Sequence, residues 1–214
     1  MKPDSMDNNA LVATLEEFSR RAETAPLTFG EALDTLDEVA YALIALILVL
    51  PFLQPIPLGP LTVIGGITFA TLGWQMWRGH ESPVLPQKIR QVEISAKVWG
   101  ILAKVCSKVM QFCQRFCKPR YVNLVNGRKG QKTGGLVLIA AGLLMAIPFG
   151  VLPLNNMLPG FAILFYCIGE LENDGLMLFI AFFWLAFTTV YFGLFFFALY
   201  YLGSEAVMRF LANI

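Results

Sequence analysis

The sequence predicts an all-α integral membrane protein. Two repeated, proline-broken helical hairpins flank an interfacial amphipathic helix, and a long C-terminal transmembrane helix follows them. Of the 214 residues, 57% are hydrophobic and only 14% are charged, whereas about a quarter of the residues of an average soluble protein are charged. The charges leave three long segments without any. Prolines break the first two of these segments, and a basic segment separates them.

Composition also excludes several classes of protein. A formal net charge of +1 argues against a nucleic-acid-binding protein, and four cysteines in 214 residues are too few for a disulfide-stabilised scaffold. The polar N-terminus lacks the basic and then apolar order of a secretory signal. The sequence contains no recognisable catalytic, phosphate-binding, dinucleotide-binding or metal-ligand motif. We therefore expect no enzymatic activity, no catalytic residues, no metal and no cofactor.

The uncharged segments cover residues 39–77, 133–169 and 175–204. Each is longer than the roughly 20 residues that a helix needs to cross a bilayer. Between the first two, residues 78–132 hold twelve basic and two acidic residues. Because Lys and Arg beside membrane segments are retained on the cytoplasmic side, we expect residues 78–132 to face the cytosol.

The charge pattern divides the chain into five predicted parts. These are a soluble N-terminal tail over residues 1–26, a first broken hairpin over 27–79, a basic cytoplasmic or interfacial segment over 80–132, a second broken hairpin over 133–175, and a C-terminal transmembrane helix with its tail over 176–214. The last part contains the longest uninterrupted apolar run, near residues 176–203, which predicts a full membrane span.

Prolines locate the breaks, because a proline lacks the N–H and clashes with the preceding turn of a helix. In the first hairpin they predict a helix that ends near Leu50 and a second helix from about Leu61 to Trp77. In the second hairpin they predict one helix that ends near Ile147 and another that ends near Gly169. Both loops between these helices are therefore expected to be non-helical.

The first of these helices is short for a membrane span. Its charge-free part, residues 39–50, covers only about 18 Å of a bilayer core that is about 30 Å thick. Thr28 and Glu31 have the spacing of a capping box and predict that the helix begins earlier. The sequence leaves open whether each hairpin is re-entrant or crosses the bilayer twice.

The two hairpins resemble each other at an offset of 96 residues. Pro57 corresponds to Pro153 and Gly73 to Gly169, which indicates an internal duplication. Paired segments broken by Pro and Gly are typical of transporter-like sites. The candidate substrate-path residues are Gln54, Pro57, Pro153, Asn155 and Asn156. The alternative is two packed hairpins without a path. The repeats are parallel if the segment between them is interfacial, and inverted if it spans the membrane.

Residues 87–118 read as one amphipathic helix. Its basic residues fall on one face at 100° per residue, and they are Lys97, Lys104, Lys108, Arg115 and Lys118. An interfacial helix can place such a face against anionic lipid headgroups, so we expect these five residues to bind headgroups. The alternative is that the apolar face packs on the hairpins and the basic stripe is simply solvated.

Two groups of carboxylates border the uncharged segments. Asp34 and Glu38 precede the first segment, and Glu170, Glu172 and Asp174 separate the second from the third. Ionisable groups at membrane depth often mark ion or proton paths, so all five are candidates for such a role. The favoured account is plainer. The first group complements a helix dipole, and the second forms a polar turn at the membrane surface.

Several motifs resemble the exopolysaccharide synthesis ExoD family of bacterial inner-membrane proteins. They are Leu-Thr-Phe-Gly-Glu-Ala-Leu at 27–33, the Pro-rich break at 51–60, Gln-Met-Trp-Arg-Gly-His at 75–80, Leu-Asn-Asn-Met-Leu-Pro at 154–159, and Gly-Glu-Leu-Glu-Asn-Asp-Gly-Leu at 169–176. The chain departs from the family at Val84 and in the central helix with its three cysteines. The resemblance implies a multi-pass inner-membrane protein linked to exopolysaccharide production, but no reaction, substrate or catalytic residue.

Two functions remain open at this point. The first is a transporter-like or flippase-like protein whose substrate path lies between the two proline breaks. The second is a non-transporting membrane scaffold or accessory protein for polysaccharide assembly. Polar groups that reach water at the breaks favour the first, and a sealed interface favours the second. The expected partners are anionic membrane lipids rather than nucleic acid, and homo-oligomers are compatible with the sequence.

Overall fold

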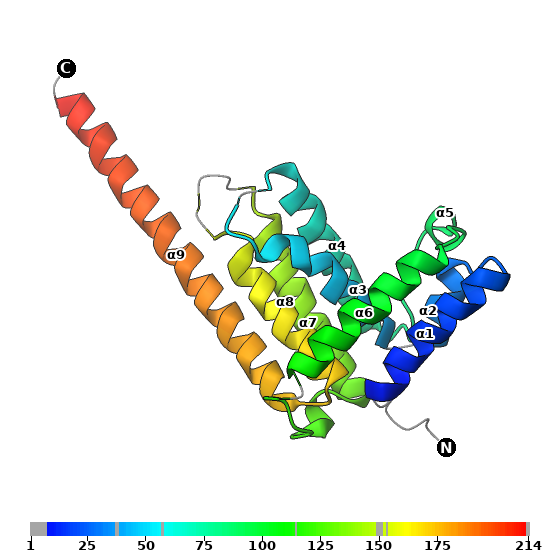
Figure 1. The fold of residues 1–214 in the computed structure, drawn as a ribbon. Coiled ribbons are helices and arrows are strands. Elements are labelled where there is room, and N and C mark those ends of the chain that lie inside the picture. The colour runs from blue at the N-terminus through cyan, green and yellow to red at the C-terminus, as the bar shows by residue number, and fades with distance from the viewer. Residues whose placement is uncertain are drawn as a thin grey trace.

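The computed structural model describes residues 8–212 except 37–38, 57, 114, 149–151 and 153. Its elements, in chain order, are α1 (Asn8–Thr24), α2 (Phe29–Leu36), α3 (Val39–Val49), the 3-10 helix η1 (Leu50–Leu53), α4 (Pro60–Arg78), α5 (Gln87–Arg90), α6 (Ala96–Cys113), the 3-10 helix η2 (Val122–Leu124), α7 (Gly127–Ala146), α8 (Met157–Leu171) and α9 (Gly175–Ala212) (Figure 1). The described part of the chain is helical and contains no β-strand. The predicted all-α class is confirmed.

The central bundle consists of the helices α3, α4, α7 and α8, and α9 lies along one side of it (Figure 1). The closest packing is between α4 and α7, followed by α8 with α9 and α3 with α8. The first helix of each predicted hairpin therefore packs on the second helix of the other hairpin. Tyr41, Phe69, Leu138 and Tyr166 are almost fully buried in this core.

Glycines bring α4 and α7 into backbone contact. A Cβ on Gly66 would lie 2.5 Å from the carbonyl oxygen of Gly142, and a Cβ on Gly73 would lie 2.5 Å from that of Gly135. Both separations are far below van der Waals contact, so only glycine fits at these positions. The pairing runs antiparallel, because the earlier glycine of α4 meets the later glycine of α7.

Both proline breaks lie at the same end of the bundle. The start of α8 touches the end of the first break, since a Cβ on Gly160 would lie 3.3 Å from Cδ2 of Leu53. The side chain of Asn156 reaches the same segment, where its Nδ2 donates a hydrogen bond of 3.5 Å to the carbonyl oxygen of Ile56. The two repeats are therefore parallel, with both breaks at what we call the break end.

The predicted helices of both hairpins are confirmed. The first break is followed by α4 over Pro60–Arg78, and α7 ends at Ala146, one residue before the predicted end. The capping box is present as well. The Thr28 backbone N–H donates to Oε2 of Glu31 at 3.1 Å, and the Glu31 N–H donates to Oγ1 of Thr28 at 3.3 Å. This capping box begins α2.

The prediction of one helix over residues 87–118 is wrong. The single turn α5 ends at Arg90, and α6 begins only at Ala96. The backbone between them pairs instead with the residues before α2. The Phe29 N–H donates to the Val92 carbonyl at 2.9 Å, and the Ile94 N–H donates to the Leu27 carbonyl at 3.2 Å. The amphipathic spacing of residues 87–118 reports only on local helix formation, so it could not reveal this long-range pairing of the segment between α5 and α6.

The predicted N-terminal tail contains a helix. Within residues 1–26, α1 packs against α6 (Figure 1). Leu15 and Phe18 are buried at this contact, and the rings of Phe18 and Trp99 meet edge to face with centroids 5.2 Å apart. Thus α1 and α6 form a two-helix arm beside the bundle.

Within the described part of the chain, one helical segment is long and apolar enough, by length and composition, to cross a membrane. It is Gly175–Gly203 in α9, and it has 29 residues. Two shorter apolar helices, Val39–Leu53 and Met157–Leu171, lie in the bundle. The predicted C-terminal helix is thus present, although α9 continues to Ala212.

The glycine contacts make a testable prediction about stability. We expect Gly66→Val and Gly142→Val each to destabilise the protein by at least about 1–3 kcal/mol, the usual range for overpacking, because the new side chain meets backbone that cannot yield. Gly193→Val is the matched control, since a Cβ on that helical glycine meets nothing within 4 Å. Thermal unfolding in detergent measures the difference. Equal melting temperatures for all three variants would contradict the close contact.

Candidate functional site: the break end and the basic end

The break end contains the candidate polar side chains of both repeats. Asn155 is 7% exposed and Asn156 is 2% exposed, whereas Gln54 lies at the surface. Pro57 and Pro153 fall outside the described residues. The structure therefore joins the two breaks through Asn156, and Gln54 does not take part in that contact.

One further polar group at this end is not among the residues predicted from the sequence. Thr62, in the first turn of α4, is 3% exposed, and its Oγ1 forms no hydrogen bond with any described residue. The Oδ1 atom of Asn156 is likewise buried and accepts no hydrogen bond from the described part of the chain. Thr62 could have been singled out from the sequence, because it is a hydroxyl residue just after Pro60 within an uncharged segment.

An aromatic side chain of the first break, Phe52, packs against α4. The ring of Phe52 lies over Gly65, where a Cβ would come within 2.3 Å of it. Phe52 also meets Phe69 of α4 edge to face, with ring centroids 6.0 Å apart. The break end is therefore a packed junction in which a few buried polar side chains sit among apolar ones.

The opposite end of the bundle holds Asp174, whose side chain is fully buried. Its Oδ2 accepts hydrogen bonds from the Lys118 N–H at 3.0 Å and from Nη2 of Arg120 at 3.3 Å. Its Oδ1 accepts a bond of 3.0 Å from the Leu176 N–H, which caps the start of α9. Asp174 thus ties the segment after α6 to the turn between α8 and α9.

The turn between α8 and α9 also has a backbone conformation that lets the neighbouring segment approach it closely. Asn173 has a φ of +52°, a left-handed conformation that Asn tolerates better than most residues. A Cβ on Gly175 would lie 2.8 Å from Cβ of Tyr121, so glycine lets the two segments approach. Glu172 is buried and Glu170 is half-buried in the last turn of α8. The polar-turn account fits the arrangement of all these residues.

The remaining carboxylate candidates do not join this turn. Asp34 lies on α2, where its carboxylate forms an ion pair with Arg90. Glu38 falls outside the described residues. The candidates that the structure describes are therefore divided between α2 and the α8–α9 turn.

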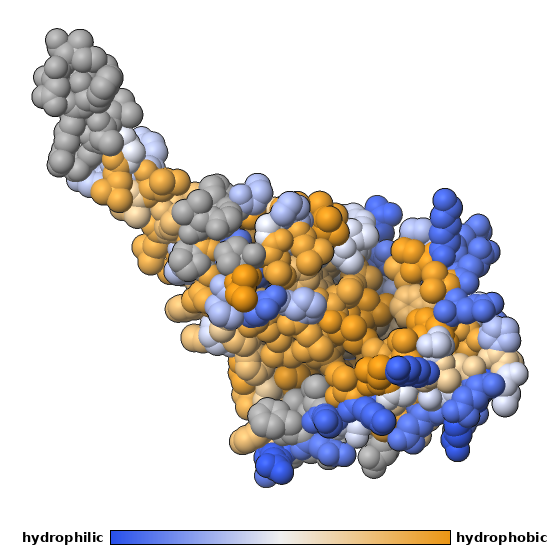
Figure 2. All heavy atoms as spheres, turned by 45° about the horizontal axis from the view of Figure 1, so that its top comes forward, coloured by the Kyte–Doolittle hydropathy of each residue, from blue (hydrophilic) through white to orange (hydrophobic). Residues whose placement is uncertain are grey.

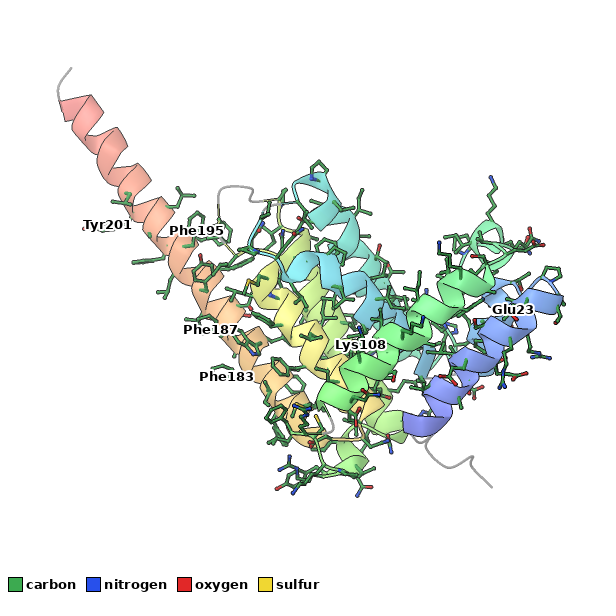
Figure 3. The ribbon with its side chains drawn as sticks, viewed as in Figure 1. Glu23, Lys108, Phe183, Phe187, Phe195 and Tyr201 are labelled. Atoms are coloured by element: carbon green, nitrogen blue, oxygen red, sulfur yellow. The ribbon has the colours of Figure 1, made fainter. Side chains whose placement is uncertain are left out.

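The basic stripe lies on the surface of the arm. Lys97, Lys104 and Lys108 are exposed on α6, whereas Arg115 and Lys118 follow the helix (Figure 3). Trp99, Ala103 and Cys106 form the face of α6 that is buried. Val98 and Ile101 stay exposed beside the lysines, so part of the apolar face of α6 is free of protein contact in the described structure.

Two tryptophans and two cations mark the end of the bundle opposite the breaks, which we call the basic end. The guanidinium of Arg78 lies 5.1 Å from the ring centroid of Trp74, and Nζ of Lys132 lies 6.0 Å from that of Trp77. Both tryptophans are exposed. They are not among the residues predicted from the sequence, although Trp-x-x-Trp-Arg before a charged segment was a usable signal.

Large apolar side chains cover the outer surface between the two ends. Ile64 on α4 is 61% exposed, Leu143 on α7 is 58% exposed, and Phe183 on α9 is 63% exposed. Figure 2 shows hydrophobic residues over the middle of the bundle and hydrophilic residues gathered along its margin. Phe183 and Phe187 point away from the bundle (Figure 3).

The fold and these surfaces define a class, a helical bundle with an apolar outer surface, one basic end and two proline breaks that meet at the other end. The chain belongs to the ExoD family, since the family described as "Exopolysaccharide synthesis, ExoD" matches residues 11–194. Protein ExoD of Rhizobium meliloti (strain 1021) is 32% identical over 179 residues, which cover 83% of this chain and 74% of that protein. No solved structure matches the chain. The resemblance seen in the sequence is confirmed, and it relates the chain to exopolysaccharide synthesis.

Asp174 allows a second prediction. We expect Asp174→Ala to destabilise the protein by about 2–3 kcal/mol, because it removes a helix cap and the charge-assisted bonds to buried backbone. Asp34→Ala is the matched control. The side chain of Asp34 is 53% exposed in its ion pair with Arg90, and exposed pairs contribute about 0–1 kcal/mol. Chemical unfolding in detergent compares the two variants, and equal losses would show that Asp174 has no special structural role.

Proposed function

We propose that this protein is a multi-pass protein of the bacterial inner membrane that serves exopolysaccharide synthesis as a non-enzymatic accessory component. The observation that carries the proposal is the exposed apolar surface of α4, α7 and α9. Large contiguous apolar patches on a monomer mark contact with a membrane or a partner. Because this surface covers three different helices between two polar ends, a bilayer is the partner that fits it.

Helix lengths support the same proposal. With 19 residues in α4 and 20 in α7, these helices are about 28 and 30 Å long at 1.5 Å per residue, close to the thickness of the hydrocarbon core of about 30 Å. Of the two shorter helices, α3 ends at the first break and α8 begins after the second. Among the described residues of the breaks, Leu53 packs near Gly160 and Asn156 bonds to Ile56, and non-helical backbone at membrane depth requires such burial within protein.

The distribution of basic residues sets the proposed orientation. Arg78, Arg128, Lys129 and Lys132 are exposed where α4 ends and α7 begins. Basic residues at membrane boundaries favour the cytosol, so the basic end is assigned to that side. The arm formed by α1 and α6 then lies at the cytoplasmic surface, with the lysine stripe toward anionic headgroups. Three helices cross after it, which leaves the end of α9 outside.

This orientation gives a third prediction. Single cysteines introduced at Ser82 and Asn126 in an otherwise cysteine-free chain should be shielded from an impermeant thiol reagent added to intact cells. Both should react after the membrane is permeabilised. The protein should also remain in the membrane pellet after extraction with alkaline carbonate. Labelling from outside would overturn the orientation, whereas release by carbonate would overturn the membrane proposal itself.

A transporter-like or flippase-like role is the second candidate. It is favoured by two observations: the parallel repeats bring both breaks to one place, and buried oxygens of Thr62 and Asn156 lack a hydrogen-bond partner among the described residues. The deep burial of Asn155 and Asn156 favours the accessory role instead, because their side chains contribute to packing rather than to an open surface.

Replacement of the two asparagines discriminates between these roles. For the accessory role we expect Asn155→Leu with Asn156→Leu to lower the melting temperature and exopolysaccharide production together, because the link from Asn156 to the first break is lost and the polar groups it leaves cost about 1–3 kcal/mol. For a transporter-like role, the double variant keeps its stability and loses production. Gln54→Leu is the control, since Gln54 is exposed. A double variant with full stability and full production would exclude a role for the pair.

A further inference from the structure

We infer that the basic end carries a binding site for one anionic phospholipid, formed by Trp74, Trp77, Arg78 and Lys132, which we call the tryptophan–cation rim. The inference rests on the proposed membrane location. It goes beyond that location, because it assigns a particular lipid class to particular residues at the junction of α4 and α7. The occupant is a lipid with a negatively charged phosphate headgroup.

The glycine contact places the rim residues on neighbouring helices. A Cβ on Gly135 would lie 3.0 Å from the backbone nitrogen of Trp77, so α7 and α4 touch at this level. Lys132 lies about one turn before Gly135 in α7, and its Nζ sits over the Trp77 ring. Two helices therefore contribute cations to one short stretch of surface.

The charges of the rim are not neutralised by the protein. Arg78 and Lys132 form no ion pair with any residue that the structure describes. Nearby, the first turn of α7 contains no acidic residue, and Asn126 caps it without a side-chain hydrogen bond. Anions are favoured at the N-terminus of a helix, so the local field attracts a negative group from outside the chain.

The apolar part of the rim identifies the occupant as a lipid rather than free phosphate. Trp74 and Trp77 are exposed, and Leu136 is exposed one turn beyond Lys132 on α7. Tryptophan rings favour the boundary between headgroups and acyl chains. The cations thus face the level of the phosphate, while the indole rings and Leu136 face the level of the upper acyl chain.

The lysine stripe of α6 provides a built-in comparison. Lys104 and Lys108 are also exposed and form no ion pair with described residues. On α6, the ring of Trp99 packs against Phe18 and is buried. The stripe can attract a charged surface, but it offers no aromatic ring beside each cation. A specific lipid site is therefore expected at the rim and only general surface attraction at the stripe.

The test uses the purified full-length chain in neutral detergent, with phosphatidylglycerol or phosphatidylcholine added to the micelles. Native mass spectrometry counts the bound lipids, and a titration gives the affinity. We expect one phosphatidylglycerol molecule to bind in preference to phosphatidylcholine. Arg78→Gln with Lys132→Gln should weaken its binding by about thirtyfold, since two surface charges are lost. Lys104→Gln with Lys108→Gln removes the same charge and should leave this binding unchanged.

Two further arms separate the alternatives. Trp74→Leu keeps both cations, so a several-fold loss of phosphatidylglycerol binding supports the aromatic contribution, and unchanged binding contradicts it. Glycerol phosphate should not compete, whereas competition at similar concentration would identify a free-phosphate site. Equal weakening by both double variants would reduce the inference to general charge attraction and overturn it. A protein that stays in carbonate-washed membranes but shows no lipid preference would overturn the lipid site and leave the proposed membrane location intact.

Discussion

Where Gly66 meets Gly142 and Gly73 meets Gly135, the backbones of α4 and α7 are in direct contact. This contact fixes the distance between the two repeats, because each helix belongs to a different one. In a bilayer, close backbone approach is also a main source of helix association, since lipid tails are as apolar as the side chains they replace. The positions of both breaks and of the basic end follow from this one contact.

The two ends of the bundle satisfy their polar groups in different ways. At the break end, amide and hydroxyl groups are buried within the junction, and Asn156 links one repeat to the other. At the basic end, the fully buried Asp174 ties the segment after α6 to the turn between α8 and α9 through charge-assisted hydrogen bonds. A buried charge is therefore used at the basic end, whereas the buried polar groups described at the break end are neutral. This difference agrees with a bundle whose ends occupy unlike environments.

The sequence predicted local features well, and long-range contacts less well. Prolines determine where α3 and α7 end and where α4 begins, because the missing N–H breaks a helix whatever the long-range contacts of the chain. The capping box at Thr28 was predictable because it, too, depends only on residues close together in the sequence. The pairing of Val92 with Phe29, which divides the expected central helix, depends on residues more than 60 positions apart and leaves no periodic signal. The Asp174 cluster was also missed in part, since the sequence singled out its carboxylate but gave no sign that the backbone N–H groups of Lys118 and Leu176 would bond to it.

The corresponding helices of the two hairpins differ in the residues at their closest contacts. If the first break is taken to contain one residue more than the second, Gly142 of α7 corresponds to Ala45 of α3, and Gly66 of α4 corresponds to Ala162 of α8. Both alanines are fully buried, so each of these positions stays small in both repeats. The added methyl groups nevertheless prevent the backbone contact that glycine allows, and α3 packs less extensively on α8 than α4 does on α7. The two interfaces between the hairpins are therefore unequal, one tight and one looser. Asn156 lies at the start of α8, a helix of the looser interface, so its hydrogen bond to Ile56 adds a polar link to the side of the bundle that lacks the glycine contact.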